Sequence, residues 1–320
     1  MTDNSDAVRD TLVALRDEMA KVIVGQEGVV TGLLTAALAN GHVLLEGVPG
    51  VAKTLAVKTF AAALDLDFAR VQFTPDLLPA DVTGQLVLDP SVRTFEHRPG
   101  PVFTNVLLAD ELNRTPPKTQ AALLEAMEER QVSVDGQAKA LPEPFLVVAT
   151  QNPIEYEGTY SLPEAQLDRF LFKLHVGYPT ADDELGMLRR HHEGLDPHDL
   201  ASAGVRPVAS REDLAAGRAA VEATPVDDKV LSYIVDLVAE TRNTGALTLG
   251  VSPRGAAALL HAAKAWAWLS GQPFVGPDEV KAVAKPAMRH RVLLRPEAML
   301  DGTEADEILD RVLSTVAVPR

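Results

Sequence analysis

Residues 47–54 read Gly47-Val48-Pro49-Gly50-Val51-Ala52-Lys53-Thr54. The apolar run 43–45 before them predicts a buried strand, and a helical pattern follows from Thr54 to Leu64. A glycine-rich turn between a strand and a helix presents backbone N–H groups to phosphate, while the lysine reaches the β- and γ-phosphates and the hydroxyl binds Mg²⁺. Ala52 stands where the generic motif has glycine, and its Cβ narrows the allowed backbone. The segment predicts a P-loop, the alternative being a glycine-rich turn before a helix.

An acidic pair, Asp110 and Glu111, follows the apolar strand pattern of residues 105–109. Phosphoryl transfer to water needs a carboxylate that holds Mg²⁺ and its waters, and a group that positions the attacking water. An isolated acidic pair would be a solvated strand end. Next to a P-loop, the two carboxylates predict a site of metal-dependent hydrolysis.

A third strand pattern, residues 145–150, ends in Gln151 and Asn152. The amide of Asn152 has the chemistry to lie between a γ-phosphate and the attacking water. The same residue before Pro153 is also typical of a turn. Together with the P-loop and the acidic pair, it favours the catalytic interpretation.

Short apolar runs at 43–45, 68–73, 106–109, 145–150 and 170–176 alternate with helical patterns. This alternation predicts a parallel five-stranded α/β sheet with helices on both faces. Two insertions, at about 85–97 and about 131–141, each read as a hairpin, with turns at Asp89-Pro90-Ser91 and Asp135-Gly136. The residues alone leave open whether these hairpins are edge decorations or working parts.

The pattern becomes helical after Tyr178-Pro179. Two of the expected helices begin with a capping-box pattern, Thr180 with Asp183 and Ser210 with Asp213, and Ser252 precedes a proline at another helix start. We therefore predict an α/β nucleotide-binding core at residues 1–180 and an all-helical lid domain at residues 181–320.

Composition limits the classes of partner. The 320 residues carry a formal net charge of −15, no cysteine, no signal-peptide pattern and no apolar run long enough to span a bilayer. A basic footprint, which nucleic-acid binders usually show, is not visible. The adjacent pair His191-His192 lies in a polar stretch and predicts a solvated linker. We expect a cytoplasmic protein without a membrane segment or nucleic-acid partner.

Several long segments resemble the MoxR family of AAA+ ATPases, in the same order and spacing. They are GVPGVAKT (47–54), FTPDLLPADVTG (73–84), LLADELNRTPPKTQAALLEAMEE (107–129), ATQNPIEYEGTYSLPEAQLDRF (149–170) and VSPRG (251–255). The resemblance covers roughly residues 20–295. Because the family's P-loop commonly carries alanine where Ala52 lies, the departure at that position supports the match.

The resemblance implies a role for each matching residue. Lys53 and Thr54 match the Walker A lysine and threonine, and Thr54 and Asp110 would hold the metal. Glu111 matches the catalytic acid and Asn152 matches sensor 1. Arg169 matches an arginine finger that reaches a neighbour's ATP, the alternative being an ion pair with Asp168 or Glu164 in the same chain. Arg254 matches sensor 2 at the start of a lid helix. Val24-Gly25-Gln26 resembles the segment that packs near adenine in this family.

The same resemblance implies ATP and Mg²⁺ as cofactors, with ATP between core and lid, and a homo-oligomeric ring, expected to be a hexamer, that remodels or matures protein complexes. The clients include proteins with a von Willebrand A domain. The insertions then become working parts that face the pore or a partner, and Arg114 is a further interface candidate. The alternatives are a motor subunit of a metal chelatase, a DNA-remodelling ATPase, and a scaffold that binds ATP without turnover.

Overall fold

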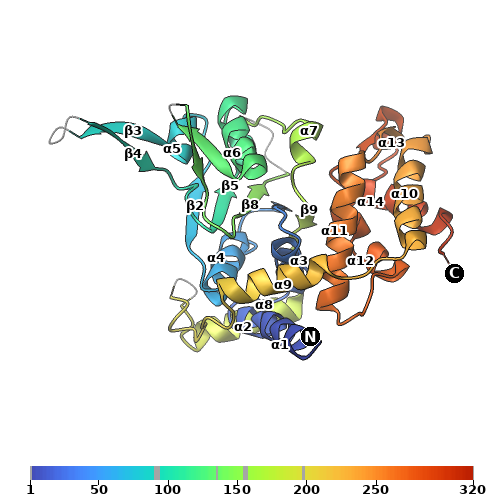
Figure 1. Cartoon of the computed structure of the whole chain (residues 1–320), viewed down its shortest axis with the longest axis horizontal. Helices are drawn as coiled ribbons and strands as arrows, with labels where there is room; N and C mark the ends of the chain where they lie inside the picture. The colour runs from blue at the N-terminus through green and yellow to red at the C-terminus, as the bar shows by residue number, and fades with distance from the viewer. Residues whose placement is uncertain (1, 90–93, 135, 154–157, 197–198, 320) are drawn as a thin grey trace.

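The computed structural model describes residues 2–89, 94–134, 136–153, 158–196 and 199–319. Its centre is a five-stranded sheet in the order β2-β5-β8-β1-β9, in which every neighbouring pair is parallel (Figure 1). The strands are β1 (Val43–Glu46), β2 (Phe68–Gln72), β5 (Val106–Asp110), β8 (Leu146–Gln151) and β9 (Phe172–His175). The predicted sheet is confirmed.

Both faces of the sheet are buried, which explains why its central strands read as continuous apolar runs. Alternate residues of β5 enter two different cores, because successive side chains of a strand point to opposite faces. Leu108 packs with α3 (Glu27–Leu38) and α4 (Lys53–Ala63), whereas Leu107 packs with α6 (Pro117–Glu129). The carboxyl ends of the strands therefore share one edge between the two helical layers.

Two hairpins leave this core at the predicted insertions. One pairs β3 (Gly84–Asp89) with β4 (Thr94–Pro99), and the other pairs β6 (Gln131–Val134) with β7 (Gln137–Ala140). The first extends well away from the rest of the molecule (Figure 1), and it follows the short helix α5 (Pro79–Thr83). Residues 90–93 and 135, where the turns were predicted, lie outside the described residues.

The remaining elements lie around the sheet. Before β1 come α1 (Thr2–Val13) and α2 (Leu15–Ala20), and the short helices η1 (Leu112–Arg114) and α7 (Glu164–Leu167) follow β5 and β8. After β9 the chain forms α8 (Ala181–His192), α9 (Arg211–Glu222), α10 (Asp228–Asn243), α11 (Pro253–Leu269), α12 (Pro277–Met288), α13 (Pro296–Leu300) and α14 (Ala305–Thr315). The predicted helical character of this part is confirmed. It also holds a short antiparallel pair that the sequence did not predict, β10 (Leu247–Leu249) with β11 (Leu293–Leu294).

The helix caps explain where several of these helices begin. The hydroxyls of Thr180 and Ser210 accept the backbone N–H of Asp183 and Asp213, and each aspartate accepts the N–H of its cap residue in return. Ser252 accepts the N–H of Gly255 at the start of α11. All three predicted caps are confirmed.

The helices after residue 180 do not form one body. Helices α8 and α9 run along the core beside α1 and α2, whereas α10–α14 form a separate lobe (Figure 1). Within α9, Gly217 is close enough to Leu12 of α1 and Leu38 of α3 that a Cβ there would meet both side chains. The boundary near residue 180 stays a prediction. Among the described residues, no helix is long and apolar enough to cross a membrane.

Candidate active site

The P-loop opens onto a cavity that brings together most of the predicted site residues. This P-loop cavity has a volume of about 520 Å³. Its walls come from the segment before α3, the P-loop, the ends of β5 and β8, and α8; the predicted site residues among them are Val24, Gln26, Pro49, Gly50, Val51, Ala52, Lys53, Thr54, Asp110, Glu111 and Asn152. The sheet thus brings the three predicted motifs to one place, at the shared carboxyl edge.

The P-loop backbone takes a conformation that L-residues seldom adopt. Gly50 has φ 84°, and Ala52, just before α4, has φ 60° and ψ 23°. A left-handed residue with a Cβ costs roughly 1–2 kcal/mol, so the surrounding structure must hold it. The ammonium group of Lys53 donates to the carbonyl of Val48 at 2.9 Å and to that of Gly47. The lysine therefore spans the loop whose N–H groups would surround phosphate.

Asp110 has both carboxylate oxygens engaged. Its Oδ1 accepts the hydroxyl of Thr150 at 2.6 Å, and its Oδ2 accepts Nε and Nη2 of Arg70 at 3.0 and 2.7 Å. Thr150 also accepts the backbone N–H of Glu111 at 2.8 Å. The hydroxyl on β8 thus fixes the orientation of both acids at the end of β5.

Glu111 is held by a second set of contacts. Its Oε2 accepts Nε2 of Gln72 at 2.7 Å and lies 3.0 Å from Nε of Arg114. Gln72 in turn accepts Nη2 of Arg70 at 2.9 Å, so one polar chain joins Asp110 to Glu111. The backbone of Glu111 is left-handed, with φ 56°. Left-handed residues other than glycine therefore occur on both sides of the cavity, at Ala52 and Glu111.

The donor set fits a hard divalent cation. Thr54 and Asp110 offer a hydroxyl and a carboxylate to the same cavity, and Mg²⁺ prefers such oxygens and keeps several waters or phosphate oxygens as well. Within the described part of the chain, no cluster of three or more His, Cys, Asp or Glu could hold a metal by itself. The residues thus suit a cation held jointly with nucleotide phosphates.

The outer wall of the cavity is α8. Met187, Arg190 and His191 line it, and Arg190 donates to the carbonyls of Ala20 and Lys21 at 2.7 Å each. The prediction of a linker at His191-His192 is wrong, since both residues belong to the last turn of α8 and His191 reaches the cavity wall, whereas their predicted solvation is confirmed because both are exposed. None of the residues of α8 is buried. The helix therefore has no buried apolar face from which its place at the cavity wall could have been predicted.

The two remaining predicted arginines lie elsewhere. Arg169 and Arg254 line a second cavity of about 300 Å³ between the end of α6, the segment after α7 and the start of α11. Glu128 bridges them: its Oε2 lies 2.9 Å from Nε of Arg169 and its Oε1 lies 3.0 Å from Nη1 of Arg254. We call this the arginine cleft. The intrachain partner of Arg169 is thus Glu128, and not Asp168 or Glu164, which the alternative to an arginine finger named.

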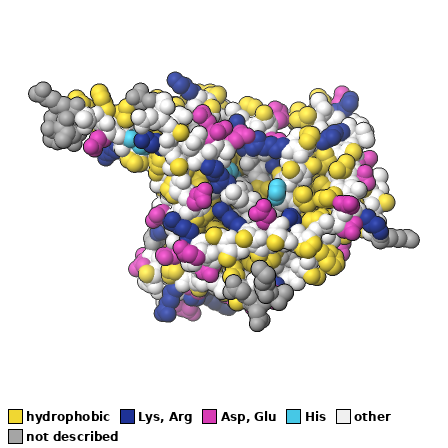
Figure 2. All heavy atoms as spheres, viewed as in Figure 1, with side chains coloured by type: hydrophobic (Ala, Val, Ile, Leu, Met, Phe, Trp, Pro, Cys, Tyr) yellow, Lys and Arg dark blue, Asp and Glu magenta, His cyan; other side chains and the backbone are white. Residues whose placement is uncertain are grey.

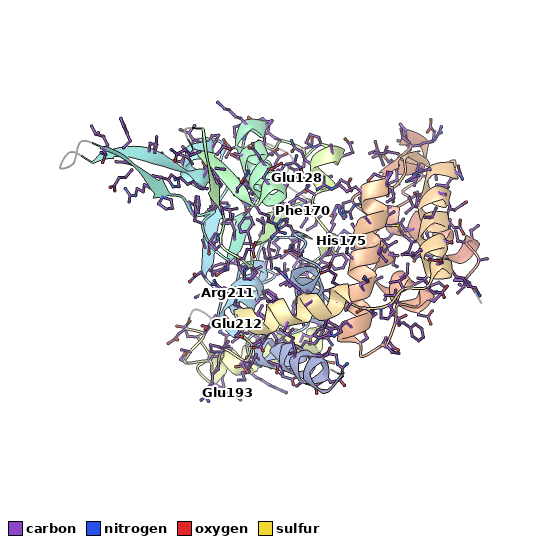
Figure 3. The ribbon with its side chains drawn as sticks, viewed as in Figure 1. Glu128, Phe170, His175, Glu193, Arg211 and Glu212 are labelled. Atoms are coloured by element: carbon purple, nitrogen blue, oxygen red, sulfur yellow. The ribbon has the colours of Figure 1, made fainter. Side chains whose placement is uncertain are left out.

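The arginine cleft faces the C-terminal lobe. Figure 3 places Glu128 and Phe170 on the side of the core nearest that lobe. The residues after 180 that line the P-loop cavity come from α8 and the turn behind it, ending at Leu195. Of the expected sensor groups, the structure therefore brings Asn152 to the P-loop and does not bring Arg254 there. Among the elements after residue 180, α8 and the turn behind it line the P-loop cavity and the C-terminal lobe does not, while the position of ATP between core and lid stays a prediction.

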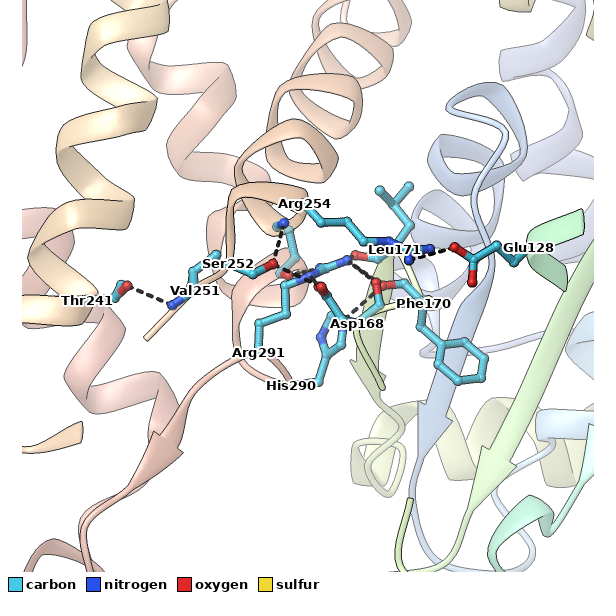
Figure 4. Close-up of polar contacts among 12 residues, drawn as sticks. Glu128, Asp168, Phe170, Leu171, Thr241, Val251, Ser252, Arg254, His290 and Arg291 are labelled. Atoms are coloured by element: carbon cyan, nitrogen blue, oxygen red, sulfur yellow. Dashed lines mark hydrogen bonds and ion pairs between the residues drawn. The ribbon is translucent and has the colours of Figure 1, made fainter. Parts of the chain in front are cut away.

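A buried ion pair holds the lobe to the arginine cleft (Figure 4). Arg291, 2% exposed, donates from Nε to Oδ1 of Asp168 at 2.6 Å and from Nη2 to the carbonyl of Phe170 at 2.7 Å. Ser252 donates to the other oxygen of Asp168 at 2.9 Å. Burial lowers the pKa of Arg291, and the charge of Asp168 opposes that shift. These contacts flank Arg169 on both sides and were not predicted.

Two buried histidines border the same region. His42 accepts the backbone N–H of Val147 with Nδ1 at 3.0 Å and lies 3.2 Å from the carbonyl of Met127 through Nε2, which assigns the proton to Nε2. Burial, with Arg130 nearby, lowers the pKa of His42 to about 3. Burial and the charge of Arg291 likewise lower the pKa of His290 well below its ordinary value. Both imidazoles are therefore neutral at pH 7.

The segment expected near adenine is divided between two cavities. Val24 lines the P-loop cavity, Gly25, with φ 69°, lines a different one formed with α11 and α12, and Gln26 lines both. The amide of Gln26 donates to the carbonyl of Gly177 at 3.1 Å. Residues missed by sequence reasoning include Arg70, Gln72 and Thr150; the one available signal was an arginine inside the strand pattern of β2.

A P-loop at the edge of a five-stranded parallel sheet, with an acidic pair and an amide on neighbouring strands and a helical lobe behind, defines an AAA+ ATPase. Known proteins agree. The ATPase family associated with various cellular activities (AAA) matches residues 42–172, and the AAA lid domain matches residues 239–312.

Relatives identify the family. The chain is 43% identical to Chaperone MoxR1 of Mycobacterium tuberculosis over 95% of this chain and 81% of that protein. It is 48% identical to the uncharacterized protein YeaC of Bacillus subtilis, over 95% and 93%. A crystal structure of a protein assigned as an ATPase, from Cytophaga hutchinsonii, superposes with a TM-score of 0.91 at 39% identity, covering 100% of this chain and 98% of the other. The chain belongs to the MoxR family of AAA+ ATPases, and it is a nucleotide-binding ATPase.

Proposed function

We propose that this ATPase works as a Mg²⁺-dependent ring in which each active site is built from two copies. The observation that carries the proposal is the separation of the arginines from the P-loop. One cavity holds Lys53, the two acids and Asn152, and the other holds Arg169 and Arg254. A site for phosphoryl transfer gains much of its rate from arginine. Arg70 and Arg190 of the same chain also line the P-loop cavity, but Arg70 is paired with Asp110 and Arg190 donates to backbone carbonyls, so we take a neighbouring copy as the source of the catalytic arginine.

Within one chain the roles follow from the contacts. The P-loop N–H groups and Lys53 bind the phosphates, and Thr54 and Asp110 would hold Mg²⁺, which neutralises charge on the β- and γ-phosphates when bound. Glu111 orients the attacking water, and the amide of Asn152, 4% exposed, lies on the next strand to bind it or the γ-phosphate. Thr150 keeps both acids in place. Val24 and Gln26, with α8, enclose the base.

We further propose that the ring, expected to be a hexamer, remodels protein clients as a chaperone does. The name of the Mycobacterium tuberculosis relative, Chaperone MoxR1, supports this. So does the projecting β3–β4 hairpin, which exposes Val87, Leu88 and Phe95 (68% exposed for Phe95) and shows hydrophobic side chains along its length (Figure 2). Exposed apolar residues on one extended element suit contact with a protein rather than with nucleic acid. A protein with a von Willebrand A domain stays the expected client class.

Mixing two inactive variants tests the two-chain site. Lys53→Ala removes the phosphate-binding cation but leaves Arg169 intact, and Arg169→Ala does the reverse. We expect each homogeneous preparation to lose roughly 10³-fold in turnover, the scale of an arginine finger. Mixed rings contain interfaces where the ATP of one variant meets the arginine of the other, so mixing should restore part of the ATPase activity.

The controls separate assembly from chemistry. Mass measurement must show mixed rings, and titration of each variant into wild-type subunits reveals coupling around the ring that would mask recovery. Absence of recovery in confirmed mixed rings, with wild-type titration showing independent sites, contradicts action in trans. A drop in the melting temperature of Arg169→Ala would instead point to a structural role through Glu128.

A further inference from the structure

The metal side of the P-loop cavity contains a cation of its own. Arg70 extends from β2, the edge strand of the sheet, and its guanidinium lines the cavity together with Asp110. The pair is made at 3.0 and 2.7 Å to a single oxygen, Oδ2 of Asp110. The other oxygen is taken by Thr150. A metal that approaches Asp110 therefore meets a carboxylate whose free lone pairs are shared with an arginine.

We propose that Arg70 is the counter-ion of Asp110 in the nucleotide-free enzyme and that metal loading displaces it. The inference rests on the proposed role of Asp110 as a metal ligand. The cation and the guanidinium repel each other when both lie against one carboxylate, since two like charges a few ångströms apart are poorly screened in a partly buried cleft. Asp110 is 8% exposed, so the repulsion is not relieved by bulk water.

The arginine is placed so that it can leave. Its side chain is 48% exposed, while that of Asp110 is 12% exposed. Besides Asp110, Arg70 contacts Gln72, whose side chain holds Glu111. Departure of Arg70 from Asp110 thus also removes one contact from the polar chain that ends at the catalytic acid. Binding of the metal to Asp110 is thereby coupled to release of Gln72 from Arg70.

The exchange has two thermodynamic consequences. Without metal, Arg70 neutralises an acid that would otherwise repel the nucleotide phosphates, so it favours metal-free nucleotide binding. With metal, Arg70 competes for Asp110, so it raises the Mg²⁺ concentration needed for tight binding. Removal of the guanidinium should therefore make nucleotide affinity more dependent on Mg²⁺. Affinity without Mg²⁺ should fall, and the Mg²⁺ concentration needed for tight binding should fall as well.

Equilibrium binding tests this without turnover. A fluorescent, non-hydrolysable ATP analogue is titrated into the full-length protein, first in EDTA and then at increasing Mg²⁺. For Arg70→Gln we expect the half-saturating Mg²⁺ concentration to fall roughly tenfold, the lower end for a hydrogen bond to a charged group at a half-exposed side chain. Affinity in EDTA should fall as well. Arg70→Lys keeps the charge and should stay close to wild type.

Arg190→Gln is the matched control. It removes one positive charge from the wall of the same cavity, but this side chain donates to the carbonyls of Ala20 and Lys21 and not to Asp110. If the half-saturating Mg²⁺ concentration shifts equally in Arg190→Gln and Arg70→Gln, the effect is one of net charge and the proposal is overturned. The proposal is also overturned if this concentration in Arg70→Gln equals that of wild type. If wild-type affinity does not respond to Mg²⁺ at all, the metal role of Asp110 fails instead. Because β2 lies at the sheet edge and Arg70 is half exposed, thermal melting should show that the glutamine variant folds.

Discussion

The P-loop cavity and the arginine cleft differ in how their charges are held. In the P-loop cavity each acid has a partly exposed arginine partner, Arg70 for Asp110 and Arg114 for Glu111, with side chains 48% and 39% exposed. In the arginine cleft one acid, Glu128, holds two arginines, and a third, Arg291, is almost fully buried.

The difference separates arginines that can reach another molecule from arginines that hold the fold. Arg291 makes several hydrogen bonds to backbone and to Asp168 in a buried setting, so its removal would take the cationic partner from the partly buried carboxylate of Asp168. Arg169 and Arg254 share one acceptor near the surface, a pairing worth little in water. If they serve a neighbour's ATP as proposed, their guanidinium groups would therefore exchange Glu128 for a phosphate at small cost.

The largest difference between the two cavities is expected from Glu111, which lines the P-loop cavity and not the arginine cleft. Glu111→Gln keeps the shape and the contact with Gln72 but removes the carboxylate that orients water. Turnover should fall by roughly 10²-fold or more, about 2.7 kcal/mol in the barrier, while ATP affinity is retained. Steady-state phosphate release and equilibrium binding measure the two quantities.

The matched control for this variant is Glu125→Gln on the exposed side of α6, which removes an equal charge away from both cavities and should leave turnover unchanged. Unchanged turnover in a pure preparation of Glu111→Gln would move the catalytic role to another group. A loss of ATP affinity equal to the loss of turnover would mean that Glu111 supports binding instead of the chemical step.

A smaller effect on turnover is expected at Arg254. Nucleotide affinity of the Arg254 variant tests whether this residue belongs to the P-loop cavity of its own chain. Arg254 does not line the P-loop cavity, so Arg254→Ala should leave nucleotide affinity of dilute, unassembled subunits within about twofold. In assembled protein, turnover should fall by roughly thirtyfold, less than for the finger because the side chain is 49% exposed. Binding is measured by fluorescence and turnover by phosphate release, both across a range of protein concentrations.

Arg311→Ala, an exposed arginine of α14, serves as the surface control. A large loss of affinity in unassembled Arg254→Ala would show that Arg254 serves its own P-loop and would break the division between the two regions. Loss of turnover that is independent of protein concentration would count against a role at a neighbour's site.

The contrast also marks what the sequence could predict. The P-loop, the acidic pair, Asn152 and the capped helices are local patterns, in which the chemistry and the backbone requirement lie within a few residues. The sheet places those patterns together without further information, because parallel strands end on one edge. The P-loop, the acidic pair and Asn152 therefore lie together at one cavity.

What the sequence could not give depends on long-range packing. The position of Arg254 follows from how the start of α11 meets the core, where Ser252 and Arg291 both contact Asp168, a residue far from either in the chain. The contact of Arg70 with Asp110 requires the pairing of β2 with β5, which no local pattern announces. The place of α8 depends on partly exposed contacts rather than on an apolar stripe, so His191 carried no signal.

The smallest effect concerns acid and the neutral histidines beside the arginine cleft. An unfolded chain takes up a proton on His42 near its ordinary pKa of about 6.5, whereas burial keeps the pKa of the folded His42 at about 3. The unfolded state therefore binds more protons between these values, and unfolding free energy falls as pH falls from about 6.5. His290 and the half-buried His175, whose pKa values are also lowered by burial, act in the same direction.

In His42→Gln, which keeps a donor and an acceptor, we expect the loss of unfolding free energy between pH 7.5 and 5.5 to be about 1 kcal/mol smaller than in wild type. Denaturant titration at the two pH values measures the difference, and an equal loss in both proteins would show that folding does not lower the pKa of His42.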